Sequence, residues 1–142
     1  MTVRRGALAG IAAAAAWAVT EPVLGRAFRT PYSDVRLLGR VVTRGRLWPL
    51  AGVALHAANG ATFGAAFARA GLRGPLAGLV VAQAENLALW PGMAAVDRFH
   101  PDRRSGVWPP LLRNGRVFAY EVTTHAVFGL LLGVLVRDER AY

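Results

Sequence analysis

Residues 56–64 read HAANGATFG, and residues 125–133 read HAVFGLLLG, so that one histidine and two glycines recur with the same spacing. Each stretch lies inside an apolar run of about 20 residues, the length that an α-helix needs to cross the roughly 30 Å hydrocarbon core of a bilayer. Because lipid offers no partners to backbone polar groups, a spanning segment is expected to be helical. The two stretches therefore predict two membrane helices, each with a histidine and two glycines on one face.

Composition favours a membrane protein over a soluble domain. The chain has 142 residues, enough for a single domain, and 54% of them are hydrophobic. The net charge of +9 could indicate nucleic-acid binding, but the arginines separate the apolar runs and suit anionic lipid headgroups better. The absence of cysteine excludes disulfides and cysteine-ligated metal centres.

Four apolar segments are long enough to span a bilayer, at 6–25, 48–67, 75–96 and 117–136. They predict an all-α fold, an integral membrane four-helix bundle that forms a single transmembrane domain over residues 1–142. A signal peptide is the alternative for the first segment, because two arginines precede its alanine-rich run. Cleavage would, however, remove a helix that takes part in an internal repeat.

The basic loop 26–47 contains Ser33, which can cap a short helix with apolar and arginine-bearing faces. This segment is expected to be either an amphipathic helix on the headgroups or an irregular basic loop. Loops 26–47 and 97–116 carry six and five arginines, against two each in the N-terminus, the loop 69–74 and the tail 137–142. The excess of arginine in these two loops predicts a multi-pass protein of the bacterial inner membrane with both long loops in the cytoplasm. His100, in the second of these loops, is expected to be solvated and to have no role.

An internal repeat is indicated by two matches at nearly the same offset. Residues 5–10 (RGALAG) and 73–78 (RGPLAG) agree at five of six positions with an offset of 68, and the two histidine–glycine stretches are 69 residues apart. Two tandem helical hairpins, related by an axis along the membrane normal, are therefore expected. Glycine pairs spaced by four let helices approach closely and could also serve a homo-oligomer or another membrane subunit. The predicted packing residues are Gly6, Gly10, Gly60, Gly64, Gly74, Gly78, Gly129 and Gly133.

Ionisable side chains within the predicted spans gather in the cytoplasmic half. At 1.5 Å per residue, Glu21 and Glu121 would lie roughly 6 Å deep. His56 and His125 would lie roughly 12 Å deep and Glu85 roughly 16 Å deep. Because a charge in mid-membrane costs about 2.5–3.5 kcal/mol on insertion scales, these groups are expected to meet. The polar network is expected to include Asn59, Gln83 and Asn86.

Three functions fit this cluster. The first is a structural or interaction role, in which polar contacts hold the helices in register. The second is a divalent-metal site, because carboxylates and imidazoles in a bundle core can hold zinc, iron or manganese. The third is the handling of protons or small solutes. The metal ligands would be drawn from Glu21, His56, Glu85, Glu121 and His125.

Haem between His56 and His125 is disfavoured, because closely packed glycine faces leave no room for a macrocycle. The chain has no phosphate-binding loop, nucleophile elbow or zincin motif. No reaction is therefore assigned to it.

The repeated histidine–glycine motif in a four-span chain resembles small bacterial inner-membrane proteins of the YagU-like type. The stretch 125–129 (HAVFG) carries this resemblance best, whereas Asn59 replaces the aromatic residue in the first stretch. The resemblance covers two helices. It implies a membrane location and a helical bundle, and no activity.

Overall fold

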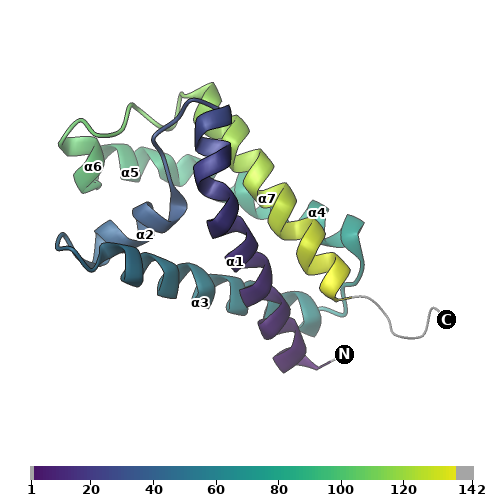
Figure 1. The fold of residues 1–142 in the computed structure, drawn as a ribbon. Coiled ribbons are helices and arrows are strands. Elements are labelled where there is room, and N and C mark those ends of the chain that lie inside the picture. Colours follow the sequence, from purple (N-terminus) through teal and green to yellow (C-terminus); the bar gives the residue numbers. More distant parts are fainter. Residues whose placement is uncertain (1, 137–142) are drawn as a thin grey trace.

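The computed structural model describes residues 2–136, and within this range the chain forms helices and turns without strands (Figure 1). The all-α prediction is therefore confirmed. The tail 137–142, whose two arginines enter the predicted orientation, lies outside the described residues. The helices are α1 (Val3–Ala27), α2 (Asp34–Val42), α3 (Trp48–Arg69), α4 (Pro75–Leu89), the 3-10 turn η1 (Trp90–Gly92), α5 (Met93–Phe99), α6 (Pro101–Arg104) and α7 (Gly115–Leu135).

The long helices pack in the order α3–α1–α7–α4, and α2 packs on α3 (Figure 1). Among the described residues, two helices, α1 and α7, are long and apolar enough to cross a bilayer, each with a mean hydropathy of 1.5. The core helices of soluble proteins and signal sequences share this length and composition. The finding therefore agrees with a membrane location without establishing one.

The predicted span 75–96 is not one continuous helix. α4 ends at Leu89, and the turn η1 separates it from α5. Pro91 lies in this turn, where it has no N–H to continue the helical hydrogen bonds. The 15 residues of α4 extend about 22 Å at 1.5 Å per residue, which is shorter than a typical hydrocarbon core.

Glycines bring α1 and α3 into backbone contact. A Cβ atom added to Gly10 would overlap the carbonyl oxygen of Gly60, and one added to Gly6 would overlap that of Gly64. The two helices are therefore antiparallel at this crossing, with their backbones too close for any side chain.

The second pair, α4 and α7, has a crossing of the same kind. A Cβ atom on Gly78 would overlap the carbonyl oxygen of Gly129, and one on Gly133 would overlap that of Gly74. These four glycines lie 68 or 69 positions after the four of the first crossing, in the same antiparallel register.

A third close contact joins α2 to α3. A Cβ atom on Gly39 would overlap the carbonyl oxygen of Trp48, and one on Gly52 would overlap that of Val35. Ser33 is the N-cap residue of α2, because its hydroxyl accepts the N–H of Arg36 at 3.1 Å, as the sequence predicted. The helical alternative for the segment 26–47 is thus confirmed over Asp34–Val42, and its backbone packs on α3.

The Gly78→Ala variant tests the crossing of α4 and α7. The added methyl group overlaps backbone of α7, which cannot rotate away, so the free energy of unfolding should fall by about 1–3 kcal/mol. Gly115→Ala is the matched control, because no atom lies within 4 Å of its added Cβ. This control should be neutral or stabilising by up to about 1 kcal/mol. Equal melting temperatures for the two variants, measured by circular dichroism, would contradict the close crossing.

Candidate functional site

Glu21 holds α2 in place from the far end of α1. Its Oε2 accepts the Ser33 hydroxyl at 2.5 Å, and its Oε1 accepts the backbone N–H groups of Asp34 at 2.8 Å and Val35 at 3.3 Å. A carboxylate at a helix N-terminus satisfies free N–H groups and interacts favourably with the helix dipole. Glu21 therefore fixes the position of Asp34 and is not among the residues that line the main cavity.

The loop after α5 fixes the other side of α2. His100 Nδ1 accepts the N–H of Asp102 at 3.2 Å, and its Nε2 donates to the carbonyl of Leu37 at 3.1 Å. Its ring stacks on Trp108 with centroids 4.5 Å apart, and only 3% of the residue is exposed. The expectation of a solvated His100 was therefore wrong, because the sequence alone did not show that this loop packs on α2.

Asp102 strengthens the same junction. Its carboxylate accepts hydrogen bonds from Arg36 Nε at 2.7 Å and from Arg36 Nη2 at 3.1 Å. Burial acts to raise the pKa of Asp102, but the hydrogen bonds and charge of Arg36 outweigh it, and the pKa falls below its usual value. This bidentate pair joins α2 to a residue 66 positions later in the chain.

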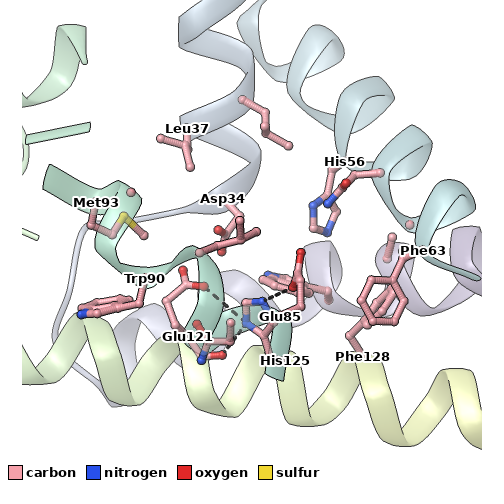
Figure 2. Close-up of a pocket in the computed structure, with 18 of the residues that line it drawn as sticks. Asp34, Leu37, His56, Phe63, Glu85, Trp90, Met93, Glu121, His125 and Phe128 are labelled. Atoms are coloured by element: carbon pink, nitrogen blue, oxygen red, sulfur yellow. Dashed lines mark hydrogen bonds and ion pairs between the residues drawn. The ribbon is translucent and has the colours of Figure 1, made fainter. Parts of the chain in front are cut away.

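A cavity of about 330 Å³ lies between the long helices and α2 (Figure 2). Its wall combines aromatic side chains with polar ones, and the lining residues come from α1, α2, α3, α4, η1, α5 and α7. The aromatic lining residues include Trp17, Phe63, Trp90 and Phe128. The polar lining residues include Asp34, His56, Asn59, Glu85, Asn86, Glu121 and His125.

His125 is held by oxygen atoms on both ring nitrogens. Its Nδ1 lies 2.8 Å from the carbonyl oxygen of Glu121 and therefore carries the proton, because a carbonyl only accepts. The same nitrogen is 3.4 Å from Oε2 of the Glu121 carboxyl group, and Nε2 lies 3.0 Å from Oε2 of Glu85 (Figure 2). His125 thus links α7 to α4.

Trp17 packs against both histidines. Its ring centroid is 5.0 Å from that of His56 and 4.6 Å from that of His125, with edge-to-face geometry in each case. Sequence reasoning placed the two imidazoles at one depth but missed this indole. A lone tryptophan in the alanine-rich run of α1 was the available signal.

Five buried polar atoms on the cavity wall have no hydrogen-bond partner among the described residues. They are Trp17 Nε1, Asp34 Oδ2, His56 Nε2, Asn86 Nδ2 and Glu121 Oε1. An unpaired buried polar atom costs about 1–3 kcal/mol, and native proteins contain few of them. All five belong to residues that line the same cavity, each on a different helix.

The carboxyl groups of Asp34 and Glu121 interact across the cavity, one from α2 and one from α7 (Figure 2). Two carboxylates can satisfy each other only when one of them carries a proton. Burial raises the pKa of Asp34 above its usual value, although the nearby imidazoles act in the opposite direction. Asp34 was not predicted as a site residue, because its place depends on the packing of α2.

The predicted metal ligands do not form a multi-ligand centre. Over residues 2–136, no group of three or more histidine, cysteine, aspartate or glutamate side chains is arranged to hold a metal ion. Glu21 binds the N-terminus of α2, whereas His56, Glu85, Glu121 and His125 all line the cavity. Of the predicted network residues, Asn59 and Asn86 line it too, while Gln83 instead donates to the Val122 carbonyl of α7 at 2.8 Å.

Comparison of the chain with protein-family models, curated proteins and solved structures finds no match. The resemblance to YagU-like proteins therefore stays a prediction, and the function is inferred from the site itself.

His100 should make the stability of the chain dependent on pH. Burial lowers its pKa below 6.5, and its Nδ1 must stay unprotonated to accept the N–H of Asp102. Below about pH 6.5 the unfolded chain therefore binds more protons than the folded chain. As the pH is lowered from this value, the unfolding free energy decreases until the pH is below the pKa of His100 in the folded chain. Melting temperatures at pH 7.5 and 5.5 should differ by several degrees more in the native chain than in His100→Gln. Equal pH dependence in the two chains would show that His100 does not contribute.

Proposed function

We propose that the chain is a multi-pass protein of the bacterial inner membrane, in which α1, α3, α4 and α7 form the bundle and the cavity binds a small polar solute. Lipid contact is supported by large apolar side chains that are exposed on all four helices. They include Val19 and Val23 on α1, Leu50 and Val53 on α3, Leu76 and Val80 on α4, and Leu130 and Val134 on α7.

The equivalent glycine crossings support the proposed duplication. Gly10 meets Gly60 in the first helix pair, and Gly78 meets Gly129 in the second. Two hairpins of one origin would conserve such a crossing, because any side chain there separates the backbones. In this arrangement loops 26–47 and 97–116 share one side of the membrane, which the arginine excess makes the cytoplasmic side.

The five partnerless polar atoms are the observation that carries the proposal of a solute site. A purely structural network would satisfy its own members, because a half-satisfied network is worse than an apolar core. His125 meets that expectation, but His56 Nε2, Asn86 Nδ2 and Trp17 Nε1 do not. A solute that both donates and accepts hydrogen bonds would pair these atoms.

A structural role is favoured for the contacts between α4 and α7. Gln83 donates to the Val122 carbonyl, and Glu85 lies 3.0 Å from His125. These contacts join α4 to α7 on the C-terminal side of Gly78, beyond the glycine crossing, where the two backbones are no longer in direct contact. The cluster thus combines a structural part with a binding part.

Cysteine labelling tests the membrane topology, and the native chain has no cysteine to interfere. In right-side-out vesicles, the variants Arg46→Cys and Ser105→Cys should be protected from a membrane-impermeant maleimide, whereas Gly71→Cys should react. Inverted vesicles should reverse the result. Release of the chain by alkaline carbonate, or reaction of Arg46→Cys and Ser105→Cys from opposite sides, would contradict the topology.

The variants His56→Leu and His125→Leu separate a solute site from a structural network. His56→Leu removes an unpaired buried nitrogen and should raise the unfolding free energy by about 1 kcal/mol. His125→Leu removes the imidazole partner of Glu85 Oε2 and Glu121 Oε2 and should lower the unfolding free energy by about 1–3 kcal/mol. Thermal unfolding in detergent measures both changes. An equal loss of stability in the two variants would show that the whole cluster is structural and would contradict the solute site.

A further inference from the structure

The cavity opens on the side of the bundle, not at its end. Its exposed lining residues are Asn59 on α3, Leu89 at the end of α4 and Gly92 in η1, and Leu89 is 63% exposed. The lining residues from α1 and α7, among them Trp17 and Glu121, are buried. The opening therefore lies between α3 and α4, the two outer helices of the row.

The inner end of the cavity is acidic. Asp34 Oδ2 and Glu121 Oε1 have no donor other than the proton shared by the two carboxyl groups, so an occupant that displaces this proton must present donors to both oxygens. None of the cavity-lining residues, all of which belong to the described range, is an arginine. An ammonium group supplies both the donors and the missing positive charge.

Much of the remaining cavity wall is apolar and aromatic. The Phe128 ring contacts Trp17, with centroids 6.1 Å apart, and Phe63, with centroids 5.2 Å apart. Trp90 and Met93 directly follow the exposed Leu89 and Gly92 in the chain and also line the cavity. Aromatic faces attract cations and also cover hydrocarbon chains. In the proposed membrane orientation the opening faces lipid, from which an amphipathic molecule can enter without crossing water.

We propose that the cavity binds an amphipathic primary amine taken from the bilayer, with its ammonium group between Asp34 and Glu121 and its apolar chain leading out between α3 and α4. This inference rests on the proposed function and names its solute class. The ammonium group replaces the proton that the two carboxyl groups share. That proton leaves to solvent while the amine keeps its own, so the charge balances. The N–H of Asn86 is left to bind an acceptor on the same molecule.

The test measures saturable binding of four radiolabelled probes to the full chain in lipid nanodiscs, with empty nanodiscs as the blank. Octylamine should bind at least about tenfold more tightly than octanol or octanoate, which have the same chain length, because a charge-assisted hydrogen bond contributes about that factor. It should also bind at least about tenfold more tightly than ethylamine, which has the same headgroup and almost no chain.

Variants locate the site. Glu121→Gln and Asp34→Asn should each weaken octylamine binding about tenfold or more, because each removes one of the two charged acceptors. Thr62→Ala is the control on α3, because its hydroxyl bonds the Ala58 carbonyl of its own helix at 3.0 Å and does not line the cavity. The comparison of the four probes uses the native chain and does not depend on whether the variants fold.

Each outcome bears on one part of the inference. If octanol or octanoate binds as tightly as octylamine, the ammonium assignment is wrong, although the cavity can still be a solute site. If ethylamine binds as tightly, the lateral path is wrong. If none of the four binds saturably, the whole inference is wrong, and the comparison of His56→Leu with His125→Leu decides the proposed function separately.

Discussion

The rest of the structure depends on the close approach of helix backbones at two glycine crossings. Gly10 and Gly60 fix α1 on α3, and Gly78 and Gly129 fix α4 on α7, at distances that exclude every side chain. Both crossings lie toward the same end of the bundle. Beyond them α3 and α7 diverge, and α2 occupies the opening (Figure 1). The cavity follows from this geometry, since small residues hold the helices together at one end and large ones separate them at the other.

The divergence would leave an open wedge if α2 were not fixed in it. Three contacts hold α2 there, each from a different part of the chain. Glu21 binds its N-terminal N–H groups, Gly52 receives the backbone of Val35, and Asp102 binds Arg36. Backbone packing and charge-assisted hydrogen bonds thus act together with the apolar cluster around Tyr32 and Trp108, against which Leu37 of α2 packs. Their effect is to place one carboxyl group, that of Asp34, on the wall of the cavity.

Sequence reasoning found the features that depend on local pattern. Hydropathy indicated helices close to the bounds of α1, α3 and α7, and Ser33 indicated the start of α2. The spacing of Glu121 and His125 put both on one face of α7, where they meet. Nothing local, however, separates a helix lying on headgroups from one packed into the bundle, and so the role of α2 was missed.

The other failures have the same physical origin. His100 is buried because its Nε2 donates a hydrogen bond to the carbonyl of Leu37, 63 positions earlier, and because Trp108 stacks on its ring. The end of α4 at Leu89 follows from Pro91, which interrupts the helical hydrogen bonds within the predicted span 75–96. Contacts over such separations leave no periodic signal in the sequence. Gly39 and Gly52 nonetheless offered a signal for the packing of α2 on α3, because the sequence analysis assigned neither glycine to a helix crossing.

The asymmetry between the two halves of the chain explains why only one histidine is satisfied. Glu121 lies four residues before His125, and the residue 69 positions earlier is Gly52, four residues before His56. A glutamate at position 52 could have bonded His56, but its side chain would overlap the backbone of α2 at Val35. Glycine there admits α2 and with it a carboxyl group that faces Glu121. The substitution that leaves His56 Nε2 without a partner is thus the same one that completes the acidic end of the cavity. Gly52 thus meets a packing requirement and at the same time decides which carboxyl groups line the proposed binding site.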